Sequence, residues 1–237
     1  MNIKVLFNSK TSNNNLSTGW GLAFLIDDNV LFDTGENGEL LINNINSLHI
    51  DINQIKSIVI SHDHWDHTGG LWDLLTLKPD IKVYGCPGFT DEFKNKVRKL
   101  ASEFIELSDF TRITTKIYST GEIICKYKGK DISEQSLIVN TNKGLSIITG
   151  CAHTGIINII KKVKSQLSVD SFYSVFGGFH LKNTSQEDIQ KIADEFLQLK
   201  VKQVGATHCS GEDAEKIFKE IYGNRFLSMD VGQDVVI

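Results

Sequence analysis

Several features that would place a protein in a special class are scarce in this 237-residue sequence. No apolar run approaches the ~20 residues of a membrane-spanning helix, and the first residues carry no long apolar segment like that of a signal peptide. The four cysteines have no close spacing, so they do not form a disulfide framework. These scarcities predict a globular protein in a reducing, cytoplasmic setting, and the 41% hydrophobic and 23% charged residues agree with it.

A surplus of basic residues is also missing. The net charge is -4 and the isoelectric point is near 6.0, which argues against a dedicated nucleic-acid binder. One basic cluster, Lys94, Lys96, Arg98 and Lys99, is expected to be the solvated face of a helix; its alternative is a phosphate or carboxylate contact at the mouth of a site. We expect neither a membrane nor a nucleic acid as partner, and the sequence leaves the oligomeric state open.

Histidine is scarce but unevenly placed. Three of the seven histidines lie in the six residues His62-Asp63-His64-Trp65-Asp66-His67, directly after a compact apolar run. In an extended segment His62 and His64 point the same way, and the turn that follows can bring Asp66 and His67 to the other side. Imidazole and carboxylate groups are ligands of divalent metals, so this segment is expected to supply ligands to two adjacent ions.

The later histidines occupy comparable positions. His153, His180 and His208 each follow a predicted strand, as the first cluster does, whereas His49 lies near a helix end and is expected at the surface. In layered α/β folds the carboxyl ends of strands face one rim, where sites assemble. Four separate strand ends are therefore expected to bring imidazole groups to the same edge.

Hydrophobic periodicity predicts a β-meander at the start, followed by alternating helices and strands. Strands are expected at 2–8, 22–26, 30–32, 58–60, 81–86, 113–117, 123–128, 136–140, 144–149, 172–176 and 201–206, with short strands in 226–237; helices are expected at 40–48, 71–77, 91–104, 156–167, 185–199 and 212–222. No linker divides the chain, so residues 1–237 are expected to form a single domain of two similar halves. Residues 87–135 are the least regular and are expected to be a substrate-covering insert.

The His62–His67 motif, the upstream Asp33-Thr34-Gly35 and the histidines after later strands resemble the metallo-β-lactamase superfamily over essentially the whole chain. The resemblance implies an α/β (α+β) fold, an αββα sandwich of two mixed β-sheets flanked by helices, with one or two metal ions at the edge between the sheets. It implies two ligand sets, the first being His62, His64 and His153 and the second Asp66, His67 and His208. Asp33 would hydrogen-bond into the ligand loop from beneath, and its alternative is a plain turn aspartate.

The segments around the later histidines narrow the resemblance. Gly150-Cys151-Ala152-His153-Thr154-Gly155, Gly177-Gly178-Phe179-His180-Leu181 and Thr207-His208-Cys209-Ser210-Gly211 look like the subgroup that includes a dihydropteroate-synthase-like enzyme of methanopterin biosynthesis. That enzyme joins a pterin pyrophosphate to a ribofuranosyl-aminobenzene phosphate. Many members are known only as metal-dependent hydrolases, so the subgroup does not fix the substrate.

The sequence departs from the family pattern at one place. Many two-metal members carry an aspartate after the penultimate strand that bridges both ions, and here that strand ends in Gly177-Gly178-Phe179-His180. Either a bridging hydroxide holds the metals alone or one site is weak. His180 is expected to contact substrate or to act as a general acid, with metal ligation and a buried structural role as alternatives.

The expected function is that of a dinuclear metal-dependent hydrolase or transferase acting on an anionic small molecule, namely a phosphate ester, a pyrophosphate or a pterin-type substrate. Two ions roughly 3.5–4 Å apart provide a metal-bound hydroxide or polarise a phosphoryl group. Asp66 and His180 are the expected catalytic residues, and the expected cofactors are two divalent ions, zinc by default, with iron or manganese also compatible.

Two alternative functions stay open at this point. The nearest is a thioester or lactone hydrolase, and the most different is a non-catalytic metal-binding protein. Cys151 and Cys209 lie beside expected ligands and are candidate soft ligands, although small buried cysteines usually only pack.

Overall fold

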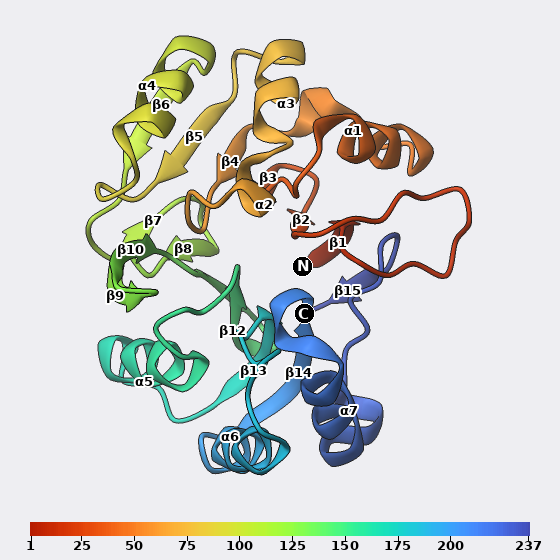
Figure 1. Cartoon of the computed structure of the whole chain (residues 1–237), viewed down its shortest axis with the longest axis vertical. Coiled ribbons are helices and arrows are strands. Elements are labelled where there is room, and N and C mark those ends of the chain that lie inside the picture. Colours follow the sequence, from red (N-terminus) through yellow and green to blue (C-terminus); the bar gives the residue numbers. More distant parts are fainter. The chain divides into compact units, whose positions relative to one another are not determined.

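The structure is a computed structural model that describes residues 1–237, and its chain divides into two compact units (Figure 1). The first comprises Met1–Ser108 with Met229–Val236, and the second comprises Asp109–Ser228 with Ile237. Each unit contains its own mixed β-sheet and its own layer of helices. The boundary falls within residues 87–135, and the single domain with a substrate-covering insert stays a prediction.

The first unit is built on a seven-stranded sheet with the order β15-β1-β2-β3-β4-β5-β6. Neighbours are antiparallel from β15 to β3 and parallel from β3 to β6, so the predicted opening meander is confirmed. Its strands are β1 (Asn2–Phe7), β2 (Ala23–Ile26), β3 (Val30–Phe32), β4 (Ser57–Val59), β5 (Lys82–Gly85), β6 (Glu103–Glu106) and β15 (Asp234–Val236).

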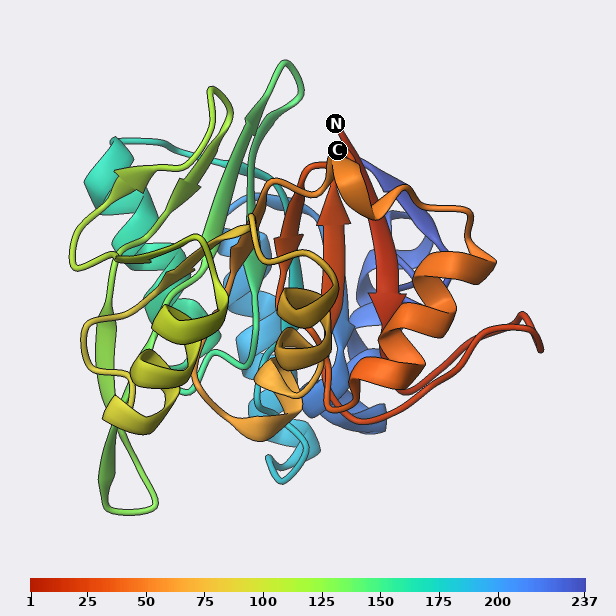
Figure 2. The same ribbon diagram turned by 90° about the horizontal axis from the view of Figure 1, so that it is seen from above.

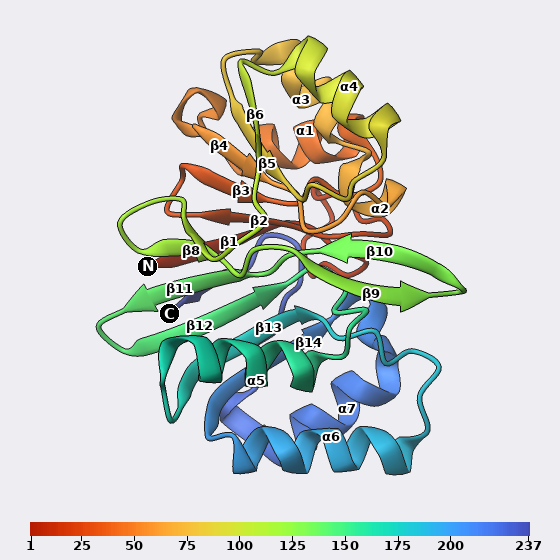
Figure 3. The same ribbon diagram turned by 90° about the vertical axis from the view of Figure 1, so that its left-hand side faces the viewer.

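Three helices of the first unit cover one face of this sheet (Figure 3). They are α1 (Gly38–Ser47), α3 (Leu71–Leu77) and α4 (Asp91–Leu100), and each turns its apolar residues toward the strands. A single turn of helix, α2 (Trp65–Thr68), follows β4. The buried core of the unit lies between these helices and the sheet, so the residues just beyond the strand ends are left at its rim.

The second unit is built on a six-stranded sheet with the order β14-β13-β12-β11-β8-β7. β12, β13 and β14 are parallel to one another and the other neighbours are antiparallel. Its strands are β7 (Thr111–Arg112), β8 (Ile117–Ser119), β11 (Leu137–Thr141), β12 (Gly144–Thr149), β13 (Phe172–Gly178) and β14 (Val201–Thr207). The helices α5 (Ile156–Leu167), α6 (Gln186–Gln198) and α7 (Gly211–Tyr222) lie along one face (Figure 3).

A separate two-stranded ribbon, β9 (Ile123–Tyr127) and β10 (Lys130–Glu134), also belongs to the second unit. Figures 2 and 3 show it as a narrow arm that extends away from the six-stranded sheet. Short 3-10 turns complete the chain at η1 (Ile52–Gln54), η2 (His208–Ser210) and η3 (Gly223–Arg225). No helix combines the length and apolar character needed to cross a membrane.

Two expected elements are wrong, and both lie in the irregular stretch. The helix expected over 91–104 ends at Leu100, and Glu103–Glu106 form β6, because Phe104 pairs with Val83 and packs into the core of the first unit. The hairpin expected from 113–117 and 123–128 does not form: β9 pairs with β10, and β8 pairs with β7 and β11. Elsewhere the expected helices agree closely, including α6 with Ser185 as its N-cap.

Three phenylalanines pack beneath the loop that follows β13. The ring centroid of Phe179 lies 5.5 Å from that of Phe196 and 5.7 Å from that of Phe218, and those two are 5.0 Å apart. All three side chains are essentially fully buried. This cluster anchors the backbone directly before His180.

Phe196→Ala should lower the free energy of unfolding by about 3–5 kcal/mol, because it removes a fully buried ring from a closely packed cluster. Urea unfolding followed by circular dichroism measures the change. Leu197→Ala is the matched control on the same helix. Its side chain is 42% exposed, so the loss should stay within about 0.5 kcal/mol. Equal losses for the two variants would contradict the packing described here.

Candidate functional site

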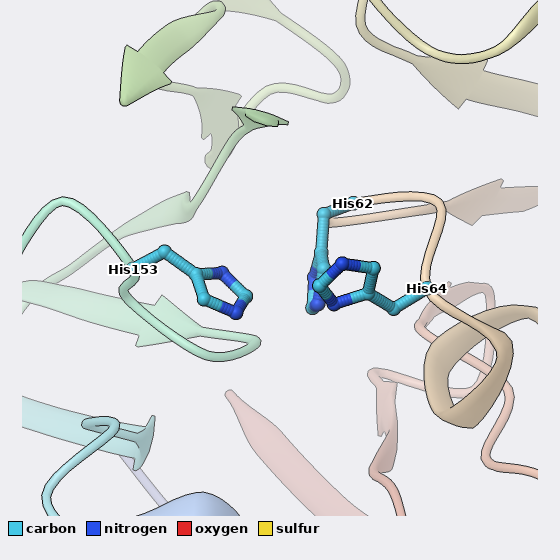
Figure 4. A group of neighbouring side chains, drawn as sticks. All are labelled: His62, His64 and His153. Carbon is cyan, nitrogen blue, oxygen red and sulfur yellow. The ribbon is translucent and has the colours of Figure 1, made fainter. Parts of the chain in front are cut away.

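In the first unit, β4 carries the histidine segment at its carboxyl end. Its residues are buried. The strand ends at Val59, and the chain bends at Ser61 before α2 begins at Trp65 with His64 as its N-cap. The ring centroid of His62 lies 4.6 Å from that of His64 and 4.2 Å from that of His67. Figure 4 shows the rings of His62 and His64 side by side; it also labels His153, which belongs to the second unit. His62, His64 and His67, which are close in sequence, thus form a compact group of imidazoles.

Asp33, at the end of β3, is fully buried and binds the start of this segment. Its Oδ1 accepts a hydrogen bond from the Ser61 amide at 2.7 Å, and its Oδ2 accepts one from the Ser61 hydroxyl at 2.7 Å. The same Oδ2 lies 2.6 Å from Nδ1 of His67, whose side chain is also fully buried. An ionised carboxylate only accepts hydrogen bonds, so Nδ1 of His67 is the donor.

These contacts determine which nitrogen of His62 carries the proton. The single hydroxyl proton of Ser61 is donated to Asp33, so Nδ1 of His62, 2.9 Å away, donates to the Ser61 oxygen. Both His62 and His67 are then protonated at Nδ1, and their lone pairs are on Nε2. A partner on the other ring nitrogen is the usual arrangement for a histidine that binds a metal.

Asp66 completes the candidate ligands of the first unit. Its Oδ2 lies 3.6 Å from Nε2 of His67. Two ligands of a tetrahedral zinc ion with bonds of ~2.1 Å are separated by roughly 3.4 Å, so this spacing fits a shared ion. The backbone of α2 packs closely against Gly21. A Cβ at residue 21 would lie 1.9 Å from the Asp66 carbonyl oxygen, and the φ of +120° at Gly21 also favours glycine.

The second unit brings three further histidines together at one sheet edge. Because β12, β13 and β14 are parallel, their carboxyl ends lie at the same edge, and His153, His180 and His208 follow these strands in turn. The ring centroids of His153 and His180 are 4.6 Å apart. Two cysteines join this edge: potential ligand atoms lie within 4.8 Å of one another in the group Cys151, His153 and His180 and in the group Cys151, His208 and Cys209.

Sequence reasoning missed Glu134, at the end of β10. Its buried carboxylate accepts hydrogen bonds from the amides of His153 (2.9 Å) and Thr154 (3.0 Å), and its Oε2 lies 3.1 Å from Nδ1 of His153. His153 is thereby protonated at Nδ1, with its lone pair on Nε2, as in His62 and His67. A lone glutamate 19 residues upstream, in a stretch expected to cover substrate, gave no signal of this contact.

The imidazole of His180 and the thiol of Cys209 influence each other's pKa. A hydrogen bond with the Cys209 thiol raises the pKa of His180 above its ordinary value, although burial acts in the opposite direction. Burial also opposes ionisation of Cys209, but hydrogen bonds from Cys151 and His180 and the charges of His208 and His180 bring its pKa well below the ordinary value. The ionised thiol is the form that binds soft metals, so Cys209 stays a candidate soft ligand.

Gly178, the last residue of β13, has no room for a side chain. A Cβ at Gly178 would lie 2.2 Å from the carbonyl oxygen of Gly150 and 2.7 Å from Sγ of Cys209. No side chain fits there unless the backbone moves. The strand instead places its next polar side chain at His180.

Four residues that begin or carry these loops have left-handed backbone conformations without being glycine. They are Asp33 (φ 58°), Ala152 (φ 58°), His180 (φ 55°) and His208 (φ 53°). Such residues are uncommon and cluster at functional sites, where the surrounding structure holds them in place. His49, also left-handed, is exposed after α1 and lies apart from both histidine groups, as expected.

The donor set fits divalent metal ions. His62, His64, Asp66 and His67 gather in the first unit, and His153, His180 and His208 gather in the second with two cysteines. Imidazole nitrogen, carboxylate oxygen and thiolate sulfur all bind zinc and related metals.

Comparison with known proteins decides the family. Residues 21–160, more than half of the chain, match the family described as the metallo-beta-lactamase superfamily. The chain belongs to the metallo-β-lactamase superfamily. The resemblance inferred from the sequence motifs is confirmed, as is the expectation of two mixed sheets flanked by helices.

Three relatives of this metallo-β-lactamase superfamily member are informative. The chain is 29% identical to the 7,8-dihydropterin-6-methyl-4-(beta-D-ribofuranosyl)-aminobenzene-5'-phosphate synthase of Methanocaldococcus jannaschii, over 90% of this chain and 88% of that protein. It is 28% identical to a crystal structure described as a metal-dependent hydrolase of the β-lactamase superfamily, with a TM-score of 0.82 over 100% of this chain and 99% of that one. Human tRNase Z, short form, shares the fold at 13% identity, with a TM-score of 0.65 over 100% and 99%.

Asp33→Asn should weaken zinc binding roughly 10- to 100-fold, because an amide cannot accept from Ser61 and His67 on both of its heteroatoms. Titration against a chromogenic chelator measures the affinity. Asp63→Asn is the matched control within the same motif, since Asp63 binds only the Thr90 amide among the contacts described, and its affinity should stay near wild type. An unchanged affinity in Asp33→Asn would contradict a supporting role for this carboxylate.

Glu134→Gln should change the preferred tautomer of His153 and weaken metal binding by about tenfold, because the amide no longer requires a proton on Nδ1. Two-dimensional ¹⁵N NMR of the imidazole nitrogens reports the tautomer directly. Asp131→Asn, on the same strand and exposed in an ion pair with Lys126, serves as the control and should leave the His153 signals in place. Identical imidazole spectra for Glu134→Gln and wild type would refute the assignment.

Proposed function

We propose that this protein is a dinuclear metal-dependent hydrolase or transferase. In this proposal His62, His64 and His153 hold one ion, and Asp66, His67 and His208 hold the other. The observation that carries it is that Nδ1 of His62, His67 and His153 each lies within hydrogen-bonding distance of a buried oxygen, which favours a proton on Nδ1 and a lone pair on Nε2. Family membership supports the same assignment.

The ions are proposed to be zinc, and iron or manganese also fits this donor set. When bound, two such ions activate water and polarise a phosphoryl or carbonyl oxygen. The chain's own residues then orient and protonate: Asp66 orients the nucleophile, and His180 donates a proton to the leaving group or holds an anionic substrate. The hydrogen bond with Cys209 raises the pKa of His180, and this direction favours the protonated imidazole that such a donor needs.

The substrate is proposed to be an anionic small molecule: a phosphate ester, a pyrophosphate or a pterin-type compound. A relative that matches 90% of the chain is named as the synthase of a dihydropterin aminobenzene phosphate. That compound contains both a pterin and a phosphate ester. The net charge of -4 favours a small molecule over a nucleic acid as partner. Hydrolysis and condensation at such a centre differ in whether water or a second substrate attacks.

Removal of metal with a chelator should abolish turnover, and restoring two equivalents of zinc should recover it. The assay uses a panel of phosphomonoesters, phosphodiesters, pyrophosphates, thioesters and lactones, with metal content measured by mass spectrometry. His64→Ala should lose about one equivalent of metal and at least a hundredfold in kcat/KM, because a metal ligand is removed. His49→Ala, an exposed histidine outside both groups, is the control and should match wild type.

Metal loss in His64→Ala with full turnover would eliminate the catalytic proposal and leave a metal-binding protein. Turnover of thioesters or lactones alone would replace the phosphate class with an acyl substrate. If two ions bind and no compound in the panel is hydrolysed, a condensing role remains, and a pterin pyrophosphate with an aminobenzene acceptor tests it.

A further inference from the structure

A pocket of about 240 Å³ lies within the second unit, beside two of its histidines. Its walls come from the loop after β12, the start of α5, the loop after β13 and one position on α6. His153 and His180 are the only lining residues with polar side chains. The remaining wall is apolar, with Ile156, Ile157, Leu181 and Ile192 as its main members.

The apolar wall of this pocket is partly exposed. Ile157 and Ile192 are partly buried, whereas Ile156 and Leu181 are buried. Apolar surface that lines a concave site and meets solvent gains free energy when a ligand covers it. The pocket therefore favours a ligand group without charge.

The size and the lining of the pocket limit further which chemical groups can bind there. A cavity of ~150 Å³ lined by leucine, isoleucine and phenylalanine is large enough for benzene, so this pocket has room for a six-membered ring with substituents. Three of its lining residues, Phe179, His153 and His180, carry aromatic rings. Aromatic rings pair favourably edge to face with one another, beyond the area that they bury.

We propose that this pocket binds an uncharged aromatic ring of the substrate, while the anionic reacting group lies at His153 and His180. The inference rests on the proposed function. It adds that the substrate carries an aryl group next to its phosphate or other anionic group. Ile157 and Ile192 determine specificity in this view, because they form the wall against which the ring packs.

Paired phosphonates test this proposal by binding alone, since they are not hydrolysed. For the zinc-loaded protein, calorimetry should give benzylphosphonate an affinity roughly 10- to 100-fold higher than that of methylphosphonate, as expected for burying one ring. Ile157→Trp and Ile192→Trp fill the pocket from two different walls and should each reduce the preference to within about threefold. Methylphosphonate affinity and zinc content should not change. Ile217→Trp is the control: Ile217 is partly buried against the same core but does not line the pocket.

A neutral probe separates failure of the pocket from failure of the metal centre. Binding of 4-methylphenol, followed by saturation-transfer NMR, should occur with or without zinc and should disappear in both tryptophan variants. If neither phosphonate binds but 4-methylphenol behaves in this way, the pocket stands and the metal-centre proposal fails. Absence of 4-methylphenol binding to wild type, or a benzyl preference that persists in both tryptophan variants, overturns the proposal.

Discussion

The candidate site of the first unit depends on one buried carboxylate, that of Asp33. An ionised carboxylate in a fully buried position is costly unless several donors surround it, and here an amide, a hydroxyl and an imidazole supply them. Those donors come from the end of β4 and from α2, so the carboxyl group at the end of β3 holds both of these segments in place. The orientation of His62 and His67 follows from this arrangement because the proton positions are no longer free to vary.

In the second unit a different acidic residue, Glu134, orients a histidine ring. Glu134 lies on a ribbon rather than in the sheet, yet it binds two consecutive amides and the Nδ1 of His153, and so fixes both the backbone and the ring. Parallel strands bring His180 and His208 to the same edge, and the close approach of Gly150 and Cys209 to Gly178 leaves no space for a carboxylate there. Both units thus use an acidic side chain from outside the histidine loop to prepare a nitrogen lone pair.

The sequence predicted this site where the signal was local. The segment His62–His67 is contiguous, and each later histidine follows an apolar run that is strand-like by itself, so their positions at strand ends could be foreseen. The errors fall between residues 100 and 134, where Glu103-Phe104-Ile105-Glu106 suits a helix as well as a strand and only pairing with β5 decides. Glu134 could not be found, because its role depends on a contact between segments whose spacing follows no periodic rule.

The left-handed residues Asp33, Ala152, His180 and His208 have a consequence for thermodynamics. Each conformation costs roughly 1–3 kcal/mol for a residue with a side chain, and this cost is met on folding by the packed strands and helices around it. The backbone therefore has little left to rearrange when a ligand arrives. In each unit, an affinity measured for a ligand of these residues should then reflect the bonds formed rather than a free-energy cost of ordering the loops, and a small heat-capacity change on metal binding would be its signature.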